Sequence, residues 1–182
     1  MKFYNTLLIG VLILLTMLVV LCTDIIYVNI ANQNIENVNE LVLTAVPGKT
    51  ELNDGESCTI HLTLKNVGNK TLNLWKMEHQ ISYDVSFVSS TDNTPAFYQC
   101  GVIERVLLTN EFLVELKPGE SLYSSINSGC WILNPGEYKL IAVYHAGERE
   151  RITKPYWKGE VSSNEELIKV GDAQNNLTAS SL

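Results

Sequence analysis

The sequence predicts an all-β protein: a two-sheet antiparallel β-sandwich behind one N-terminal transmembrane helix. Three observations lead to this prediction. Apolar and polar residues alternate in several short segments after residue 57, and Gly, Pro, Asn and Asp interrupt these segments at short intervals. Beyond the first 28 residues, no segment keeps the 3.6-residue period of an amphipathic helix. Short extended segments separated by turn residues are typical of sandwiches.

The first 28 residues predict a membrane anchor. Sixteen residues from Leu7 to Cys22 carry no charge, and the wider segment from Phe3 to Tyr27 has aromatic residues at both ends. At ~1.5 Å per residue that wider segment would be roughly 36 Å long, enough to cross a bilayer. The alternative is a cleaved signal peptide, but cleavage requires small residues where the sequence has Val20 or Leu21. We therefore favour an uncleaved anchor.

The remainder of the chain is predicted to face outward. Lys2 precedes the apolar segment and Asp24 follows it, which places the C-terminal domain outside a cell membrane that the chain crosses once. Residues 29–39 are rich in asparagine and read as a linker, 40–171 form the sandwich, and 172–182 form a disordered tail.

Composition restricts the classes of partner. The chain has 182 residues, 46% of them hydrophobic, and a formal net charge of −7. This length accommodates one ordinary domain with accessory segments. Because no basic stripe with interleaved aromatic residues occurs, nucleic acid is not an expected partner.

Period-two alternation marks the individual strands. In the segment SCTIHLTLKN, Cys58, Ile60, Leu62 and Leu64 share one face, which predicts a half-buried strand. Further extended segments are TLNLWKM from Thr71, YDVSFV from Tyr83, EFLVEL from Glu111, ESLYSSI from Glu120 and GEVSSNEELIKV from Gly159.

The stretch WILNPGEYKLIAVY, from Trp131 to Tyr144, supplies a more specific motif. The motif consists of Leu133, Gly136 and Tyr138. Tyr138 begins an alternating strand, in which it shares one face with Leu140 and every second residue after it. This pattern resembles the tyrosine corner of immunoglobulin-like and fibronectin type III-like sandwiches, as found in prokaryotic cell-surface proteins. The resemblance implies an immunoglobulin-like fold in which the Tyr138 hydroxyl bonds back to the chain a few residues upstream.

The sequence also departs from the antibody pattern. Leu140 stands where an antibody-type domain has its second bridging cysteine, although Cys58 lies where the first would be. Trp75 falls approximately where such domains have a core tryptophan. The resemblance therefore implies the layout of the sandwich without its inter-sheet disulfide.

Four cysteines are present, and their pairing is open. Cys22 lies in the apolar N-terminal segment, and Cys58 is expected to be a small buried residue. Cys100 and Cys130 are both expected near turns outside the membrane, and a disulfide between them is the preferred pairing. The alternative is two reduced thiols on separate loops.

No residue pattern points to catalysis. His61, His79 and His145 are scattered and lack a second ligand at a metal-binding spacing, and no nucleophile motif such as G-x-S-x-G occurs. We therefore expect no enzymatic activity, no metal and no cofactor. Asn69 and Asn176 begin glycosylation sequons, which would be used only if the host glycosylates exported chains.

The connection from His145 to Glu160 is the predicted binding loop. It contains Arg149, Arg151, Tyr156 and Trp157, and arginine and aromatic side chains are frequent in interface hot spots. The alternative is that Trp157 folds back and covers the edge of the sandwich.

Two functions are compatible with these features. The first is non-catalytic binding, as an adhesion, envelope-assembly or accessory module whose partner is another envelope protein or a glycan. The second is inhibition of an extracytoplasmic protease, because the order of the turn motifs L-x-P-G-E and L-x-P-G-x-Y resembles the BsuPI-type inhibitor family. However, the NPTTG loop of chagasin-type inhibitors is absent.

Overall fold

The computed structural model describes residues 40–104 and 106–172, and all of them belong to one compact unit, Val38–Leu182. The described part is all-β, and its only helical segments are two short 3-10 turns, Asn110–Phe112 and Ser128–Cys130. No helix in this part is long or apolar enough to span a membrane. The predicted anchor 1–28, the linker 29–39, Asn176 and nearly all of the predicted tail lie outside the described residues.

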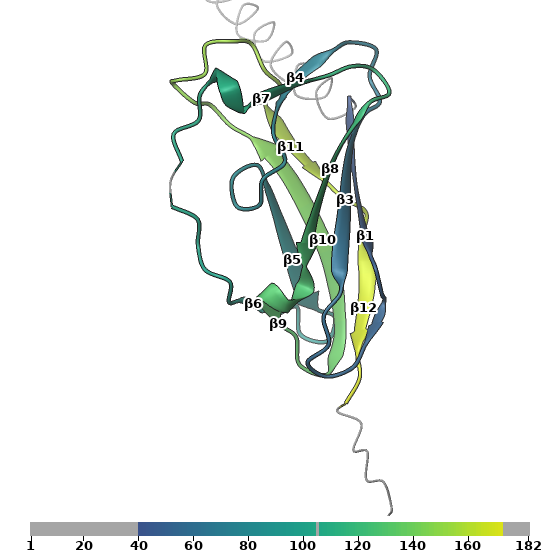
Figure 1. Ribbon diagram of the computed structural model, residues 1–182. Helices are drawn as coiled ribbons and strands as arrows, with labels where there is room; N and C mark the ends of the chain where they lie inside the picture. Colours follow the sequence, from purple (N-terminus) through teal and green to yellow (C-terminus); the bar gives the residue numbers. More distant parts are fainter. Residues whose placement is uncertain (1–39, 105, 173–182) are drawn as a thin grey trace, which may run out of the picture. The chain divides into compact units, whose positions relative to one another are not determined.

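Two antiparallel layers form the body of the domain (Figure 1). One sheet has the order β1 (Leu41–Pro47), β3 (Thr59–Asn66), β8 (Ser121–Asn127). The other is built around the long strand β10 (Gly136–Ala146), which pairs with β5 (Tyr83–Ser89) along one side. On its other side β10 pairs with β11 (Gly159–Ser162) and β12 (Glu166–Val170).

This order is that of an immunoglobulin-like sandwich. β1, β3 and β8 take the places of strands A, B and E, and β5, β10 and β12 take those of C, F and G. A two-residue strand, β2 (Glu51–Leu52), adds to β12 in parallel. Two small ladders lie apart from the main sheets: β4 (Leu72–Trp75) with β7 (Leu113–Leu116), and β6 (Phe97–Tyr98) with β9 (Trp131–Ile132).

The core follows the predicted alternation. Cys58, Ile60, Leu62 and Leu64 are buried, as are the alternate residues Tyr138, Leu140, Ala142 and Tyr144 of β10. Trp75 and Phe87 are fully buried and fill the space between the layers. The apolar face of each sheet therefore meets that of the other, which is the main stabilising interaction of such a fold.

The C-terminal extended segment differs from the prediction. It forms two strands, β11 and β12, instead of one. Between them the side chain of Asn164 leaves the sheet, accepts a hydrogen bond from the Ala45 amide (3.0 Å) and donates one to the Ala45 carbonyl (3.2 Å). This amide side chain imitates a neighbouring strand, so it closes the outer edge of β1 and connects the two sheets.

Asn66 organises the end of the domain where β3 ends and β7 leads into β8. It is fully buried, and its amide nitrogen donates to the carbonyls of Lys70 (2.8 Å) and Leu116 (2.9 Å), while its oxygen accepts from the Gly68 amide (3.0 Å). Buried amides are stable when their donors and acceptors are satisfied in this way. Asn66 thus fixes the turn after β3 against β7 and the start of β8.

Candidate functional site

The candidate site lies along one side of the sandwich, between the small ladders. Residues 99–104 and 106–109, here called the strap, belong to the connection from β6 to the 3-10 turn at Asn110 and have no regular secondary structure (Figure 1). The strap occupies the region of the chain where many sandwiches have a further strand beside β8. Three sets of contacts hold the strap: a disulfide at its first end, hydrogen bonds from Gln80 just after the disulfide, and hydrogen bonds from Asn110 at its far end.

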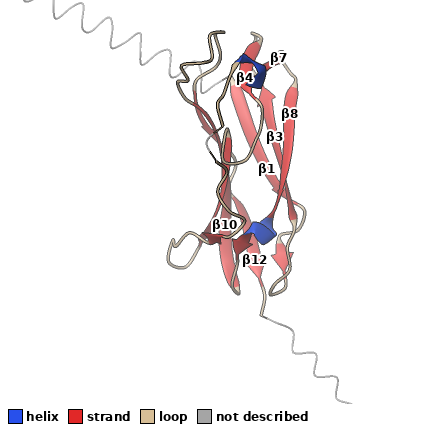
Figure 2. Ribbon diagram, turned by 60° about the vertical axis from the view of Figure 1, so that its left-hand side comes forward, coloured by secondary structure: helices blue, strands red, loops and turns tan. Residues whose placement is uncertain are grey.

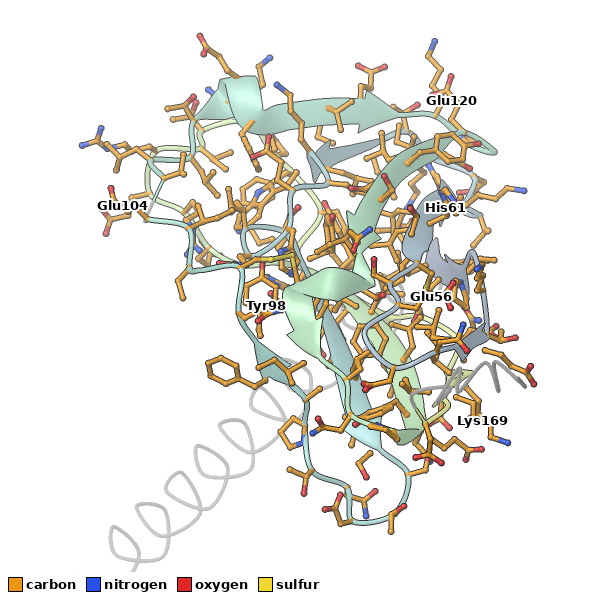
Figure 3. The ribbon with its side chains drawn as sticks, turned by 60° about the horizontal axis from the view of Figure 1, so that its bottom comes forward. Glu56, His61, Tyr98, Glu104, Glu120 and Lys169 are labelled. Carbon is orange, nitrogen blue, oxygen red and sulfur yellow. A yellow bond between two sulfur atoms is a disulfide. The ribbon has the colours of Figure 1, made fainter. Side chains whose placement is uncertain are left out.

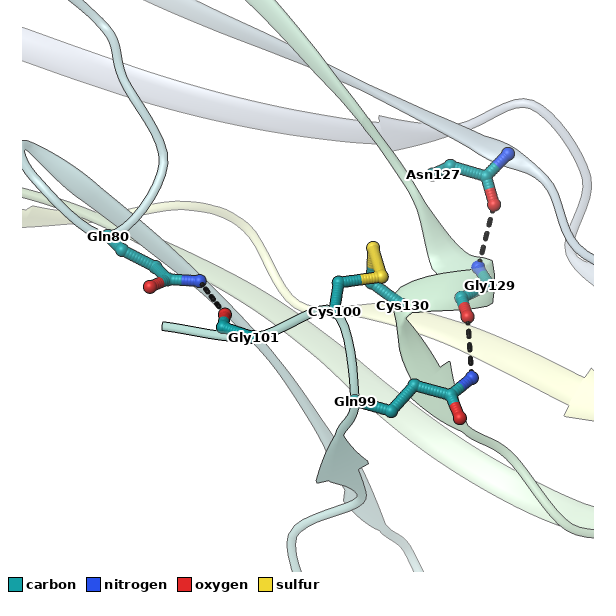
Figure 4. The surroundings of a disulfide bond; sticks show 7 residues. All are labelled: Gln80, Gln99, Cys100, Gly101, Asn127, Gly129 and Cys130. Carbon is teal, nitrogen blue, oxygen red and sulfur yellow. Dashed lines mark hydrogen bonds between the residues drawn. A yellow bond between two sulfur atoms is a disulfide. The ribbon is translucent and has the colours of Figure 1, made fainter. Parts of the chain in front are cut away.

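A disulfide fixes the first end of the strap. Cys100 and Cys130 are joined, with their Cα atoms 5.0 Å apart (Figure 4). Beside the bridge, the Gln99 amide donates to the Cys130 carbonyl (2.8 Å), and the Gln99 side chain donates to the Gly129 carbonyl (2.9 Å). The strap therefore leaves the body of the domain at a covalently fixed point.

Gln80 holds the strap immediately after the disulfide. Its side-chain nitrogen donates to the Gly101 carbonyl (2.9 Å), and its oxygen accepts from the Ile103 amide (2.7 Å), the first of which is drawn in Figure 4. A glutamine side chain paired in this way takes the place of a neighbouring strand. Gln80 itself lies in the turn between β4 and β5 and has a positive φ of 64°.

Asn110 holds the far end against the predicted binding loop. Its oxygen accepts from the amides of Thr153 (3.0 Å) and Lys154 (3.1 Å), and its nitrogen donates to the Thr153 hydroxyl (2.8 Å). Asn73 of β4 adds a further connection, because its side chain donates to the Pro155 carbonyl (2.9 Å). The strap and the loop are therefore parts of one arrangement.

Apolar side chains of the strap face solvent. Val102 is 89% exposed and Leu107 is 68% exposed, and Ile103 and Val106 are also exposed. Leu108, by contrast, is buried and fastens the end of the strap to the core. Glu104 lies at the periphery of the domain, whereas Tyr98 lies closer to its middle (Figure 3). An exposed apolar group of this kind is typical of interaction sites.

A pocket of about 500 Å³ lies beneath these side chains. Its lining mixes apolar and polar residues: Gln80, Glu104 and Arg149 are the polar members, and the apolar members are Ile81, Ile103, Val106, Leu107 and Leu108. A second hollow of about 340 Å³ continues along Leu107, Glu148, Arg149 and Arg151. The volume suits one or two amino-acid side chains of a partner or a small ligand.

Arg149 places a cation at the border of the pocket. Its guanidinium lies over the ring of Trp75, 5.2 Å from the centroid, and its backbone amide donates to the Tyr156 hydroxyl (3.1 Å). The neighbouring Glu148 pairs with Lys158 (2.6 Å) instead, and this hydrogen bond raises the pKa of the lysine. Within the described residues, no carboxylate forms an ion pair with Arg149, so its charge is available to a ligand.

The predicted binding-loop residues separate into two groups. Arg149 and Arg151 are exposed, and Tyr156 is half-buried, with its hydroxyl donating to the Gly147 carbonyl (2.7 Å). Trp157 is only 4% exposed and packs against Tyr144, with ring centroids 5.8 Å apart. The expectation that Trp157 is a surface contact is therefore wrong, and the alternative, that it covers the sandwich edge, describes its position.

Gly159 explains how the indole is accommodated. It has a φ of 153°, and a Cβ at this position would lie 3.0 Å from the Trp157 ring. The indole therefore occupies the space that a side chain at position 159 would need. This close approach requires glycine.

The structure also shows where the other residues singled out from the sequence lie. The Tyr138 hydroxyl donates to the Asn134 carbonyl (3.1 Å), which is the contact of a tyrosine corner. Cys58 is a buried free thiol, and Asn69 is exposed in the turn after β3. His145 pairs with Asp84 (3.2 Å), and within the described ranges no three His, Cys, Asp or Glu residues gather as a metal site would require.

Sequence reasoning missed Gln80, Asn110 and the strap itself. The available signal was the segment VIERVLL, 102–108, in which two apolar groups flank an acidic and a basic residue without alternation, between a cysteine and an asparagine. A single run of this kind does not show that a side chain from another turn holds it. The pairing of Gln80 with the strap depends on tertiary structure alone.

The sequence matches no family model and no curated protein. Among solved structures, the chain is similar to the sporulation control protein Spo0M of Bacillus subtilis, with 11% identity and a TM-score of 0.43 over 72% of this chain. It spans about half of that protein, 49% of its length. The CARDB domain of PF1109 from Pyrococcus furiosus is similar over 74% of this chain and 94% of its own, with 11% identity and a TM-score of 0.37.

A third similar structure is a beta-glucosidase from Listeria innocua in complex with glucose. It has 16% identity and a TM-score of 0.39, over 74% of this chain and 16% of the glucosidase. At such values the likenesses carry no functional information. The immunoglobulin-like arrangement rests on the strand order of this chain itself.

Proposed function

We propose that this chain is a non-catalytic binding module, tethered to a cell membrane by residues 1–28, that holds an envelope protein at the strap. The observation that supports this proposal most directly is the strap itself. Its exposed apolar side chains are held by the Cys100–Cys130 disulfide, Gln80 and Asn110 around a pocket of about 500 Å³. A preorganised apolar surface loses less conformational entropy on binding than a free loop does.

The chemistry of the pocket suggests the type of ligand. The apolar lining residues favour an aliphatic or aromatic side chain, and Arg149 favours a carboxylate, which the charge of Glu104 in the same lining partly opposes. A partner segment with an apolar residue next to an acidic residue, or next to its C-terminal carboxylate, has both groups. Because stacking on Trp75 restricts the guanidinium, Arg149 needs little further ordering when such a carboxylate binds.

Site-specific photo-crosslinking of the full-length chain in its native membrane tests the proposal. A photoreactive amino acid at Leu107 should capture a partner, and the same group at Leu167, which is exposed on β12, should not. Mass spectrometry of the crosslinked peptide should show an apolar residue beside a carboxylate. Equal capture of unrelated proteins from both positions would contradict a specific site.

A charge variant separates the pocket from a merely sticky surface. Arg149→Gln should reduce capture from position 107 about tenfold or more, because a lost charge-assisted hydrogen bond is worth roughly 1.5–3 kcal/mol. Lys65→Gln removes an exposed positive charge from β3 and is the matched control, for which capture should be unchanged. Capture that persists in Arg149→Gln would exclude recognition of a carboxylate.

Protease inhibition is the second candidate, and one observation favours it. The strap is an exposed, irregular segment fixed by an adjacent disulfide, and such a segment can enter the cleft of a protease without being cleaved productively. The full-length chain in detergent should then inhibit at least one member of a protease panel. Inhibition should fall when Val102, the most exposed apolar residue of the strap, is replaced by Glu. No inhibition at micromolar concentration would exclude this function.

A further inference from the structure

Strand β8 is an open edge of the three-stranded sheet. It pairs with β3 along all seven residues, Ser121–Asn127, and lies at the outer border of the sheet (Figure 2). The pairing register has no bulge, and the strand contains no proline and no charged residue. Natural proteins commonly protect edge strands with one of these features, because an open edge offers hydrogen bonds to another strand.

Two other outer strands, β1 and β5, are covered. The Asn164 side chain bonds the backbone of β1, which also ends at Pro47. Along β5, the Ser89 amide donates to the Thr94 carbonyl (2.9 Å), and the Ala96 amide donates to the Phe87 carbonyl (2.8 Å). No comparable contact to the outer backbone of β8 occurs within the described residues. Among these three long outer strands, β8 is therefore the open one.

We infer that β8 is a self-association site, at which two copies of this chain pair their β8 strands antiparallel about Ser124. In that register, Ser121 lies opposite Asn127, Leu122 opposite Ile126, and Tyr123 opposite Ser125. Each larger side chain thus meets a smaller or complementary one, and no like charges face each other. The two three-stranded sheets would join into one six-stranded sheet.

The charge pattern at the ends of β8 is compatible with a second copy as the occupant of this edge. Just before β8 lies Glu120, which the same register places opposite Ser128 of the second copy, an uncharged residue. The charged end of one strand therefore meets the neutral end of the other. Tyr123 is 75% exposed in the isolated domain, and its ring would reach the diagonal Tyr123 of the second copy, ~7–8 Å away.

Half-burial of the inward residues is consistent with this arrangement. Leu122 and Ile126 pack against the core but are only partly buried. Each would gain an apolar neighbour directly opposite, which removes further apolar surface from water. The inference concerns the edge of β8 and not the pocket beneath the strap, so its failure in an experiment leaves the proposed binding function untouched.

Register-specific crosslinking of full-length chains in membranes tests the inference. Two differently tagged copies are co-expressed with Cys22→Ser, one carrying Tyr123→Cys and the other Ser125→Cys. Opposite positions have Cβ atoms ~4.5–5.5 Å apart, close to the span of a disulfide, so mild oxidation should join the two tags. Each copy expressed alone places its cysteines diagonally, and we expect at least fivefold less dimer. The Val42→Cys and Val46→Cys pair, exposed on β1, is the matched control and should give none.

Charge substitution gives the second arm of the test. Tyr123→Lys with Ser125→Lys places lysines opposite lysines in the paired strands and should reduce dimer formation, measured by chemical crosslinking, to the level of the β1 control. A second copy with Tyr123→Glu and Ser125→Glu should restore mixed dimers with the lysine copy. Dimer formation that is unchanged in the lysine copy, or a 123/125 signal equal to the control, would overturn the inference.

Discussion

Trp157 fastens the 147–158 segment to the sandwich. Its ring is buried against Tyr144, and its backbone amide donates to the Asn73 carbonyl (2.9 Å), so the side chain and the backbone hold the same point. Arg149 and Tyr156 both contact the ring of Trp75 nearby. The ligand-facing side of this segment therefore depends on a residue that is not itself exposed.

Trp157→Ala is expected to destabilise the domain by about 3–5 kcal/mol, because it removes a buried aromatic side chain and leaves a cavity. Urea unfolding of the full-length chain in detergent measures this loss. Arg151→Ala is the control, since its exposed side chain should contribute within about 0.5 kcal/mol. An unfolding free energy that is unchanged in Trp157→Ala would mean that the indole is not a core group in solution.

His79 couples stability to pH. It lies among the rings of Tyr83, Tyr98 and Trp131, with centroids 5.5, 5.3 and 5.9 Å away. Burial lowers its pKa below the usual value, opposed in part by the charge of Asp84. Because the folded state disfavours the protonated form, the stabilising contribution is complete above about pH 6.5. It is lost as the pH falls through that value toward the lower pKa of the folded state.

The measurable consequence is a fall in unfolding free energy between pH 7.5 and pH 5 that His79→Phe reduces. Urea unfolding at several pH values shows the slope for each variant. His145→Gln is the comparison, because His145 pairs with Asp84 at the surface instead of packing among aromatic rings. If His79→Phe retains the full acid slope, other groups are responsible for it.

At the scale of the element, the strap is irregular but has fixed attachment points. Gln80 supplies two hydrogen bonds to its backbone, and Asn110 supplies three bonds between its far end and the 147–158 segment. A strap without these bonds would remain joined to the domain through Cys100 and Leu108. Its apolar side chains would then no longer be preorganised around the pocket.

Gln80→Met should loosen the strap without unfolding the sandwich. Methionine has a similar length but neither donates to Gly101 nor accepts from Ile103. Hydrogen–deuterium exchange should become faster by about tenfold or more at the Ile103 amide, whereas the amides of β3 should keep their protection. Exchange at Ile103 that matches the unchanged chain would show that Gln80 does not hold the strap.

Local patterns predicted strands well where one face is buried. The alternation of β3 and β10 follows from burial on one side, which the sequence records directly. The proline-glycine turn and Tyr138 likewise lie within a few residues of their partner, Asn134. β1, whose ladder is with β3, was not predicted, and neither was the break at Asn164, whose side chain bonds Ala45, 119 positions away. The strap escaped prediction for the same reason.

At the scale of the whole molecule, a few polar contacts connect the layers through an otherwise apolar core. The Tyr144 hydroxyl of β10 donates to the Trp75 carbonyl (2.8 Å), and the Tyr83 hydroxyl of β5 meets the Ser124 hydroxyl of β8 (2.9 Å). Burial raises the pKa of Tyr144 far above its usual value, so its phenol stays protonated and keeps donating. These contacts fix how one sheet lies on the other, whereas apolar burial provides most of the stability.

The Cys100–Cys130 disulfide closes a covalent loop within the sandwich domain. It joins residues 30 positions apart, and the enclosed segment contains the strap, β7 and β8. A loop of this length is expected to add about 3–4 kcal/mol by restricting the unfolded chain. The double variant Cys100→Ala/Cys130→Ala should therefore lose about that amount of unfolding free energy in urea, and Cys58→Ala, which leaves the disulfide intact, serves for comparison.

The same double variant distinguishes two roles of the disulfide. If it acts only on the unfolded chain, crosslinking from position 107 to a partner should persist at temperatures where the domain stays folded. If it also positions the strap, capture should fall even there, because Gln99 and Cys100 would no longer fix where the strap leaves β6. We expect the second result, since Gln80 bonds the strap only after that point. Full capture by the folded double variant would show that the hydrogen bonds of Gln80 and Asn110 suffice to hold the strap.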